Sequence, residues 1–405
     1  MFSVSSVYIH IPFCRSKCHY CDFFSVPVDS VPDDYIQSLL QELDFHILSG
    51  HFTKLKTLYI GGGTPSLLTC SQIEKILAKL RPFFSYDYEA TMEMNPESVS
   101  MDFLDFIKNN GINRVSLGVQ SLNDSTLSCV NRCANSVTTI NALQLICASG
   151  LSFSADLIAG LPLQTDDVFV NGLKTVISYK PSHISLYALT ITEGTILDKR
   201  IQLKELICPT ENIDSQWILG RDILEESGFY QYEVSNFAPK GNESKHNSVY
   251  WKQESYIGIG AGASSSVYFY NNEILSKGLR YTNTENIENY ISFWLKKSIE
   301  KKDFQESSIM ESFLPVNFLG EIEILDKKTL AFEFCMLGLR LLKGINTNEY
   351  FCRFGEKLNI DLFKEYEKKS LVFSYIDAVN EQWFSMGKKG ILFLNQFLED
   401  LLEEY

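Results

Sequence analysis

"CRSKCHYCDF", residues 14–23, places Cys14, Cys18 and Cys21 within eight positions, with no fourth cysteine beside them. A structural zinc site closes its shell with four ligands, so three thiols leave such a shell incomplete. Thiolates also hold iron–sulfur clusters, and three of them on a four-iron cluster leave one iron free for donor atoms of a substrate. The rest of the sequence is needed to decide between these two kinds of site.

The zinc interpretation requires a fourth ligand close to the cysteines. His10 and His19 are the two candidates, and either would complete a Cys₃His set. The spacing of the cysteines does not exclude this arrangement, which would make the chain a zinc-dependent structural protein.

Length, composition and charge indicate a large globular protein. At 405 residues the chain suggests a barrel-sized unit of roughly 200 to 250 residues with a second, smaller one. The apolar fraction of 45% and the aromatic fraction of 13% are globular values. A formal net charge of −14 disfavours non-specific attraction to nucleic acid or to an anionic bilayer, so we expect no nucleic-acid partner.

The sequence also predicts where the protein works. The N-terminal "MFSVSSVYIHIPFC" has no basic region before its apolar run, which argues against a signal peptide. No stretch approaches the ~20 uninterrupted apolar residues that a spanning helix needs. We therefore expect a cytoplasmic protein without a membrane span, whose remaining cysteines stay reduced.

Short apolar runs rich in β-branched residues alternate with helical patterns. The runs predict six buried parallel strands, at 7–12, 55–60, 89–94, 114–119, 152–160 and 183–191. Between them, residues 32–48, 71–80 and 136–150 carry helix signals, including a serine N-cap at the second and Gly150 after the third. The pattern predicts an α/β fold, either an open doubly wound sheet or, as we favour, a partial (β/α)6 barrel.

Polar residues at the strand ends favour the barrel. "GGGTPS" follows the second strand, and Glu93, Gln120 and Asp156 lie at or near the ends of the next three. In barrels these ends meet at one mouth, where the cysteine loop would also lie. Glycines let the backbone approach a ligand closely, Glu93 and Asp156 suit a cation or ribose hydroxyls, and Arg132 suits a carboxylate.

The motifs together resemble those of a known family. "YIHIPFCRSKCHYCDF" (8–23) resembles the CxxxCxxC signature of radical S-adenosylmethionine (SAM) enzymes, in the branch that includes oxygen-independent coproporphyrinogen III oxidase. The resemblance continues through "LYIGGGTPSLL" (58–68), "NRVSLGVQS" (113–121), "DLIAGLPLQT" (156–165), "HISLYALTITEGT" (183–195) and "YEVSNFA" (232–238).

This resemblance implies a set of cofactor contacts. Cys14, Cys18 and Cys21 would hold a [4Fe–4S] cluster whose unique iron binds the amine and carboxylate of SAM. The positions that match contacts of this first SAM are Tyr8, Gly63 and Glu93. Those that match contacts of either SAM or a second SAM are Tyr20, Thr64, Pro65, Gln120, Arg132, Asp156 and Ala188.

Two features resemble the HemW-type heme chaperones of this branch more than the oxidase. Phe23 stands where the oxidase motif has a fourth cysteine, and "HNSVYW" (246–251) matches the chaperones' HNxxYW motif with His246, Asn247, Tyr250 and Trp251. Imidazole is a common axial ligand of heme iron, and aromatic rings can cover the macrocycle.

The resemblance therefore implies a heme chaperone that delivers heme to acceptor hemoproteins such as respiratory enzymes. The alternative is the oxidase itself, which decarboxylates its substrate to protoporphyrinogen IX after a flavodoxin or ferredoxin type donor has reduced the cluster. Whether the chain is an enzyme stays open at this point. In either case we expect a core barrel at 1–236, an extension carrying the heme motif at 237–324, and a mainly helical module at 325–405 that closes the open side of the barrel.

Overall fold

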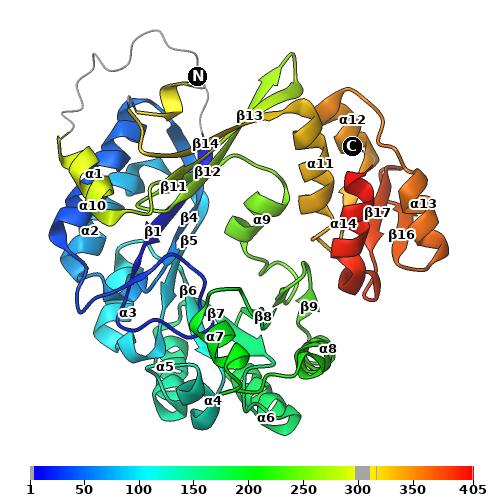
Figure 1. Cartoon of the computed structure of the whole chain (residues 1–405). Coiled ribbons are helices and arrows are strands. Elements are labelled where there is room, and N and C mark those ends of the chain that lie inside the picture. Colours follow the sequence, from blue (N-terminus) through cyan, green and yellow to red (C-terminus); the bar gives the residue numbers. More distant parts are fainter. Residues whose placement is uncertain (1–3, 297–310, 316, 404) are drawn as a thin grey trace.

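The computed structural model describes residues 4–296, 311–315, 317–403 and 405 (Figure 1). One nine-stranded sheet organises the chain, in the order β11-β1-β4-β5-β6-β7-β8-β10-β9. Its six parallel central strands are those predicted, namely β1 (Val4–Ile11), β4 (Phe52–Gly62), β5 (Phe84–Met94), β6 (Arg114–Gln120), β7 (Ser152–Ala159) and β8 (His183–Ala188). The predicted α/β class with a partial barrel is confirmed.

Three short strands extend the sheet beyond these six. β11 (Ile257–Ile259) pairs in parallel with β1, and β10 (Asn236–Ala238) pairs antiparallel with β8 and with β9 (Tyr230–Gln231). The last predicted strand ends at Ala188 and not at residue 191, because the chain there turns into the mouth of the sheet.

Helices cover the outer face of the sheet, as Figure 1 shows. They are α1 (Asp33–Leu48), α2 (Cys70–Leu80), α3 (Met101–Asn109), α4 (Asp124–Cys129), α5 (Ser136–Ser149), α6 (Asp166–Ser178), α7 (Ile196–Gln202) and α8 (Thr210–Glu226). The three predicted helices are α1, α2 and α5. α2 is capped by Thr69, which forms a capping box with Gln72, so the predicted serine cap is wrong by two residues.

The two faces of the parallel strands differ in polarity. On the outer face, Leu58, Met92 and Leu117 are fully buried against the helices. On the inner face, strand register places Glu93 beside Ser116 and Gly118 beside Asp156. Because side chains alternate along a strand, each strand contributes polar residues to the inner face and apolar residues to the core. The inner face of the sheet is thus polar, and the outer face packs in the hydrophobic core.

An extension continues from the last strand of the sheet. A short helix, α9 (Lys245–Trp251), lies on the inner side of the sheet against β4, opposite the outer helices (Figure 1). An antiparallel meander follows, formed by β12 (Ser264–Asn271), β13 (Ile274–Asn283) and β14 (Gly320–Asp326), with α10 (Ile287–Lys296) packed on α1. Residues 297–310 lie outside the described ranges.

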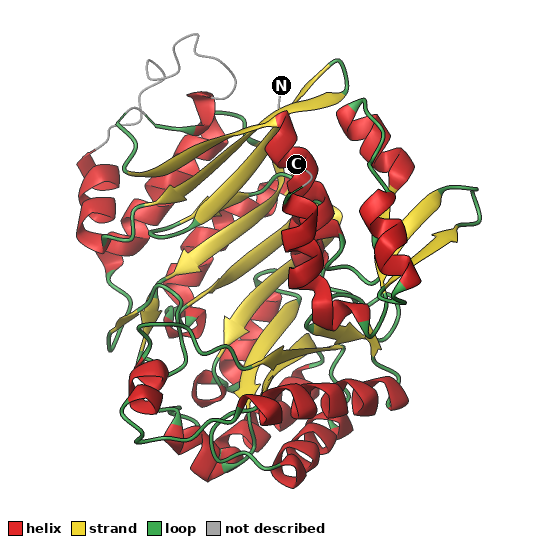
Figure 2. Cartoon of the chain, turned by 45° about the vertical axis from the view of Figure 1, so that its right-hand side comes forward, coloured by secondary structure: helices red, strands yellow, loops and turns green. Residues whose placement is uncertain are grey.

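The C-terminal part is helical with a small sheet. Its helices are α11 (Lys327–Gly338), α12 (Thr347–Phe354), α13 (Asp361–Lys368) and α14 (Leu394–Leu402), and its strands are β15 (Ile345–Asn346), β16 (Val372–Ile376) and β17 (Gln382–Met386). Figure 2 shows the β16–β17 pair beside the helices. The module expected at 325–405 to be mainly helical thus also contains strands, because a short apolar run fits a strand as well as a helix.

Within the described residues, no helix has the length and apolar character needed to cross a bilayer.

Candidate cluster and cofactor site

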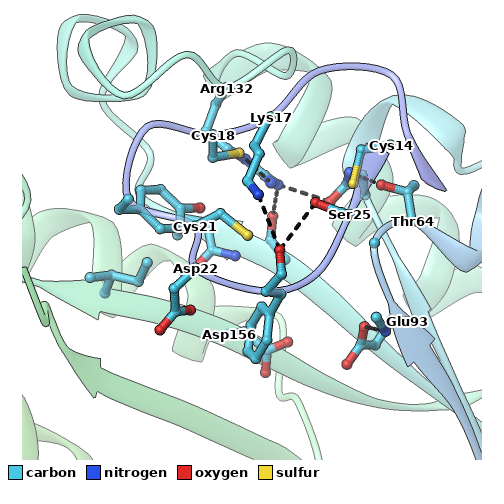
Figure 3. Close-up of a pocket in the computed structure, with 18 of the residues that line it drawn as sticks. Cys14, Lys17, Cys18, Cys21, Asp22, Ser25, Thr64, Glu93, Arg132 and Asp156 are labelled. Carbon is cyan, nitrogen blue, oxygen red and sulfur yellow. Dashed lines mark hydrogen bonds between the residues drawn. The ribbon is translucent and has the colours of Figure 1, made fainter. Parts of the chain in front are cut away.

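The cysteine loop closes over the mouth of the sheet. β2 (Phe13–Cys14) pairs in parallel with β3 (Val26–Pro27), so the residues between them form a loop anchored at both ends. Cys14, Cys18 and Cys21 are half-buried and face one cavity of about 400 Å³. Figure 3 shows the three thiols around this cavity. The loop therefore brings three thiols to one place and keeps them accessible.

The segment "CVNRC" (129–133) fastens this loop. Asn131, whose φ of 60° is left-handed, donates from Nδ2 to Ser16 Oγ at 2.8 Å and to the Lys17 carbonyl at 3.0 Å. The backbone NH of His19 donates to the carbonyl of Val130 at 3.0 Å. Cys129 and Cys133, the two cysteines of the segment, do not line the cavity.

Arg132 connects the segment 129–133 to the cavity. Its Nη1 lies 3.6 Å from Cys18 Sγ, and its Nη2 donates to the Gly118 carbonyl at 2.7 Å and to Asn95 Oδ1 at 3.1 Å. Its Nε is buried without a hydrogen-bond partner among the described residues. A buried cationic donor without a partner suits an anionic group such as a carboxylate.

Two carboxylates lie on the opposite side of the cavity, as Figure 3 shows. Glu93 accepts from the Tyr59 hydroxyl at 2.8 Å and from the Gly62 NH at 3.0 Å. Asp156 accepts from Ser116 Oγ at 2.8 Å. Burial raises the pKa of Glu93 to about 7, although the hydrogen bond from Tyr59 works against the rise. Burial also raises the pKa of Asp156. A bound cation would favour the ionised form of both groups.

The glycine turn holds the cysteine loop in place. The Gly63 NH donates to the Ile11 carbonyl at 2.9 Å, and the Thr64 NH donates to the Phe13 carbonyl at 2.7 Å. A Cβ on Gly63 would lie 2.6 Å from the Phe13 oxygen. The absence of a side chain at Gly63 therefore lets the backbone at Phe13 approach closely. The amides of Gly63 and Thr64 are hydrogen-bonded within the protein and are not free to contact a ligand.

The two histidines of the zinc interpretation are engaged elsewhere. His10 contacts the Tyr8 hydroxyl through Nδ1 at 2.8 Å and the Phe24 carbonyl through Nε2 at 3.1 Å. His19 Nδ1 lies 3.2 Å from the Cys129 carbonyl. In the part of the chain that the structure describes, no three His, Cys, Asp or Glu side chains gather closely enough to hold one metal ion.

The separation of the three thiols around the cavity fits a cluster better than a single zinc ion. Thiolates on one zinc ion all lie about 2.3 Å from the same centre, whereas each thiolate on a cluster binds a different iron. Three separated thiols around an open cavity, with a cationic donor on one side and two carboxylates on the other, match the donor set that a [4Fe–4S] cluster and SAM would require.

Most of the predicted cofactor residues line this cavity. They are Cys14, Cys18, Cys21, Tyr20, Gly63, Thr64, Pro65, Glu93, Gln120, Arg132, Asp156 and Ala188. Tyr8 does not line it. Sequence reasoning missed Tyr59, Asn95 and Ser116, which orient the predicted residues, because their partners lie on other strands and no local pattern marks them.

The heme motif occupies the inner side of the sheet. His246 is only 1% exposed, with Nδ1 at 2.8 Å from Thr57 Oγ1 and Nε2 at 2.8 Å from Tyr250 Oη. Burial lowers its pKa to about 3. The guanidinium carbon of Arg340 lies over Trp251, 4.6 Å from the centre of the tryptophan ring. Both ring nitrogens of His246 form hydrogen bonds, so neither is available to bind iron in this conformation.

A second cavity of about 370 Å³ adjoins the heme motif. It shares Asp22 and Phe23 with the cluster cavity, so the end of the cysteine loop separates the two. Its walls are Tyr8, His10, Asp22, Phe23, Phe24, Tyr250, Tyr256, Gly262, Ser264 and Glu285. Phe24 and Tyr256 were not singled out by the sequence, although the paired aromatics after Cys21 were a usable signal.

Known proteins share this fold. Residues 8–176 match the radical SAM superfamily. A solved structure, coproporphyrinogen III oxidase (HemN) from Escherichia coli, covers 98% of this chain and 90% of its own with a TM-score of 0.76. At 21% identity that likeness shows the fold alone. The fold and the three-cysteine cavity define a protein of the radical SAM class.

The sequence relatives narrow the class to a family. The heme chaperone HemW of Escherichia coli is 34% identical over 98% of this chain and 98% of that protein. The same protein of Lactococcus lactis is 32% identical over 98% of this chain and 97% of that one, and that of Bacillus subtilis is 31% identical over 93% and 94%. The chain belongs to the HemW family.

Proposed function

We propose that this protein is a cytoplasmic heme chaperone that binds heme and passes it to an acceptor hemoprotein such as a respiratory enzyme. One observation carries the proposal: an aromatic cavity bordered by Tyr250 of the HNxxYW motif adjoins the three-cysteine cavity across Asp22 and Phe23. A pocket with several aromatic rings on its walls suits a flat macrocycle, and heme is the ligand named in the relatives' own names.

The cluster and SAM belong to the same proposal. Cys14, Cys18 and Cys21 would hold a [4Fe–4S] cluster, which supplies an iron with an open coordination position and an electron once a flavodoxin or ferredoxin type donor has reduced it. Arg132 Nε would meet the carboxylate of SAM, and Glu93 would accept from its ammonium group. Asp156, already oriented by Ser116, suits the ribose hydroxyls.

The proposal excludes oxidase activity, which gives it a direct test. We would reconstitute the cluster anaerobically, add SAM, a reductant and coproporphyrinogen III, and look for decarboxylated product by chromatography, with heme capture measured on the same preparation. We expect heme capture without product. Robust formation of protoporphyrinogen IX would overturn the chaperone assignment and make the chain an oxidase.

Matched cysteine variants test the cluster separately. Cys18→Ser should lower the iron bound after reconstitution, because it removes one thiol of the cavity, whereas Cys70→Ser should not, because Cys70 is exposed at the start of α2. Equal iron content in the two variants would exclude the three-cysteine cavity as the cluster site.

A further inference from the structure

We propose that heme docks in the second cavity with Tyr250 as the iron ligand, and that His246 orients this phenol and does not bind iron. The inference rests on the proposed function, since it assumes that the chain carries heme. It assigns the ligand to a different residue of the motif from the one that the sequence favoured.

The environment of His246 argues against iron ligation. Thr57 and Tyr250 occupy its two ring nitrogens at 2.8 Å each, and the ring stacks on Tyr59 with centroids 5.2 Å apart. His246 is absent from the wall of the cavity, whereas Tyr250 is part of it. An imidazole that bound iron would have to break a buried hydrogen bond and leave its partner unsatisfied.

Tyr250 has the chemistry that the site needs. Tyrosine is an established heme ligand, and it binds ferric iron as the phenolate. When the iron–oxygen bond forms, the phenol releases its proton to water at the open mouth of the cavity. The buried His246 stays neutral, and its Nε2 at 2.8 Å can donate to the phenolate oxygen while Thr57 Oγ1 donates to Nδ1. The oxidation state of the iron does not change in this step. The hydrogen bond also fixes the position of the phenol oxygen.

A second tyrosine–histidine pair, Tyr8 with His10, borders the same cavity. His10 Nε2 must donate to the Phe24 carbonyl, so His10 Nδ1 can only accept from the Tyr8 hydroxyl and has no proton to offer a Tyr8 phenolate. His246 can donate from Nε2 while Thr57 donates to Nδ1, so Tyr250 is the better ligand of the two. His10 is itself held by the Phe24 carbonyl at 3.1 Å.

The remaining walls suit a porphyrin plane. Tyr256 packs edge-on against Tyr250 with centroids 4.7 Å apart, and Phe24 stacks on His10 at 6.2 Å. Phe23 is 65% exposed beside them and offers a further ring at the mouth. Asp22 and Glu285 are exposed acids on the rim, so the propionates of heme, which carry the same charge, would point to solvent away from these two side chains.

The test is a titration of the cluster-loaded full chain with ferric heme, followed by absorbance, electron paramagnetic resonance and resonance Raman spectra. We expect the wild type to show phenolate ligation. Tyr250→Phe should lose that signature and bind heme at least tenfold more weakly. His246→Gln should keep the signature with a several-fold loss of affinity. Tyr270→Phe, an exposed tyrosine of β12, should match the wild type.

The outcomes separate this inference from the proposed function. A wild type that does not capture heme would overturn the proposed function itself. A wild type with histidine ligation that His246→Gln abolishes and Tyr250→Phe preserves would overturn the inference alone, as would loss of the phenolate signature in Tyr8→Phe but not in Tyr250→Phe. If Tyr250→Phe fails to fold, Tyr250→His should convert the signature from phenolate to imidazole, and an unchanged spectrum would overturn the inference.

Discussion

Single residues at the mouth of the sheet combine structural and binding tasks. Arg132 holds Gly118 and Asn95 and approaches Cys18, while its Nε remains without a partner in the described part of the molecule. Gly62 adopts a φ of +113° so that its amide can reach Glu93. Arg132 thus connects the cysteine loop to a strand end, and Gly62 connects the ends of two neighbouring strands, so each can be tested separately.

Arg132→Lys should weaken SAM binding by roughly tenfold while the bound iron is retained. Lysine keeps the charge but lacks the planar fork that reaches several acceptors at once. Equilibrium dialysis with SAM and iron analysis measure the two effects. Arg81→Lys, a surface substitution, is the control. Unchanged SAM affinity would exclude Arg132 as a SAM contact.

Gly62→Ala should destabilise the fold by more than the roughly 1–2 kcal/mol that a left-handed backbone costs an L-residue. Its Cβ would lie 2.6 Å from the His10 ring, so a clash adds to the backbone cost. Gly194 has a φ of +83° and open space where a Cβ would lie, with nothing within 4 Å, so Gly194→Ala carries the backbone cost alone. Urea unfolding measures the loss of stability in the two variants. Equal losses would mean that the His10 ring moves away from the new Cβ at little cost.

At the scale of elements, α9 depends on β5 and β6 for its position. Glu89 accepts from the backbone NH of His246 at 3.0 Å and from that of Lys245 at 3.3 Å, and it pairs with Arg114 at 3.1 Å. A carboxylate at a helix N-terminus satisfies amides that have no partner within the helix. The sheet therefore fixes the start of the helix that carries the heme motif.

Glu89→Gln should cost about 3–5 kcal/mol of stability, because it leaves Arg114 buried with a neutral partner. Hydrogen exchange of the α9 amides should rise in the same variant. Glu365→Gln, which breaks an exposed i,i+4 pair with Lys369, should cost at most about 0.5 kcal/mol. Similar unfolding free energies for both variants would mean that the buried pair does not stabilise α9.

At the scale of the whole molecule, contacts between distant residues join the core sheet to the extension and the extension to the C-terminal helices. Glu42 of α1 accepts from the Gly260 NH at 2.8 Å, from Asn283 Nδ2 at 2.7 Å and from the Tyr290 hydroxyl, which connects the core sheet to the extension. Arg340 over Trp251 connects the C-terminal helices to α9. Movement of the C-terminal helices would therefore remove a contact of Trp251.

Glu42 should give stability a measurable pH dependence. Burial raises its pKa to about 7, so the folded chain holds a proton that the unfolded chain loses near its ordinary value of 4.5. By linkage, its contribution to the free energy of unfolding falls as pH rises through this window. Urea unfolding at several pH values measures the free energy of unfolding of wild type and of Glu42→Gln. The value for wild type minus that for the variant should fall as the pH rises. Buried histidines titrate in both proteins and largely cancel.

A flat difference between pH 4.5 and 7 would contradict this prediction, because it would mean that Glu42 has the same pKa in both states. The value at high pH is informative as well, since above pH 7 both states are ionised and the difference should no longer change.

Sequence determined the strands and the thiols. Apolar runs such as "LKTLYI" and the CxxxCxxC spacing are local, so periodicity and spacing predict the six parallel strands and the three-cysteine loop without coordinates. The residues at the strand ends were predicted for the same reason, because strand alternation fixes the face on which Glu93 and Asp156 lie.

Tertiary structure alone decided how these parts meet. That Asn131 holds the cysteine loop, that Thr57 and Tyr250 occupy both nitrogens of His246, and that Tyr250 borders a second cavity are contacts between residues far apart in the chain. Such contacts depend on strand register and packing, which no local pattern encodes. The sequence thus identified the HNxxYW motif, and the fold decided which of its side chains faces the cavity.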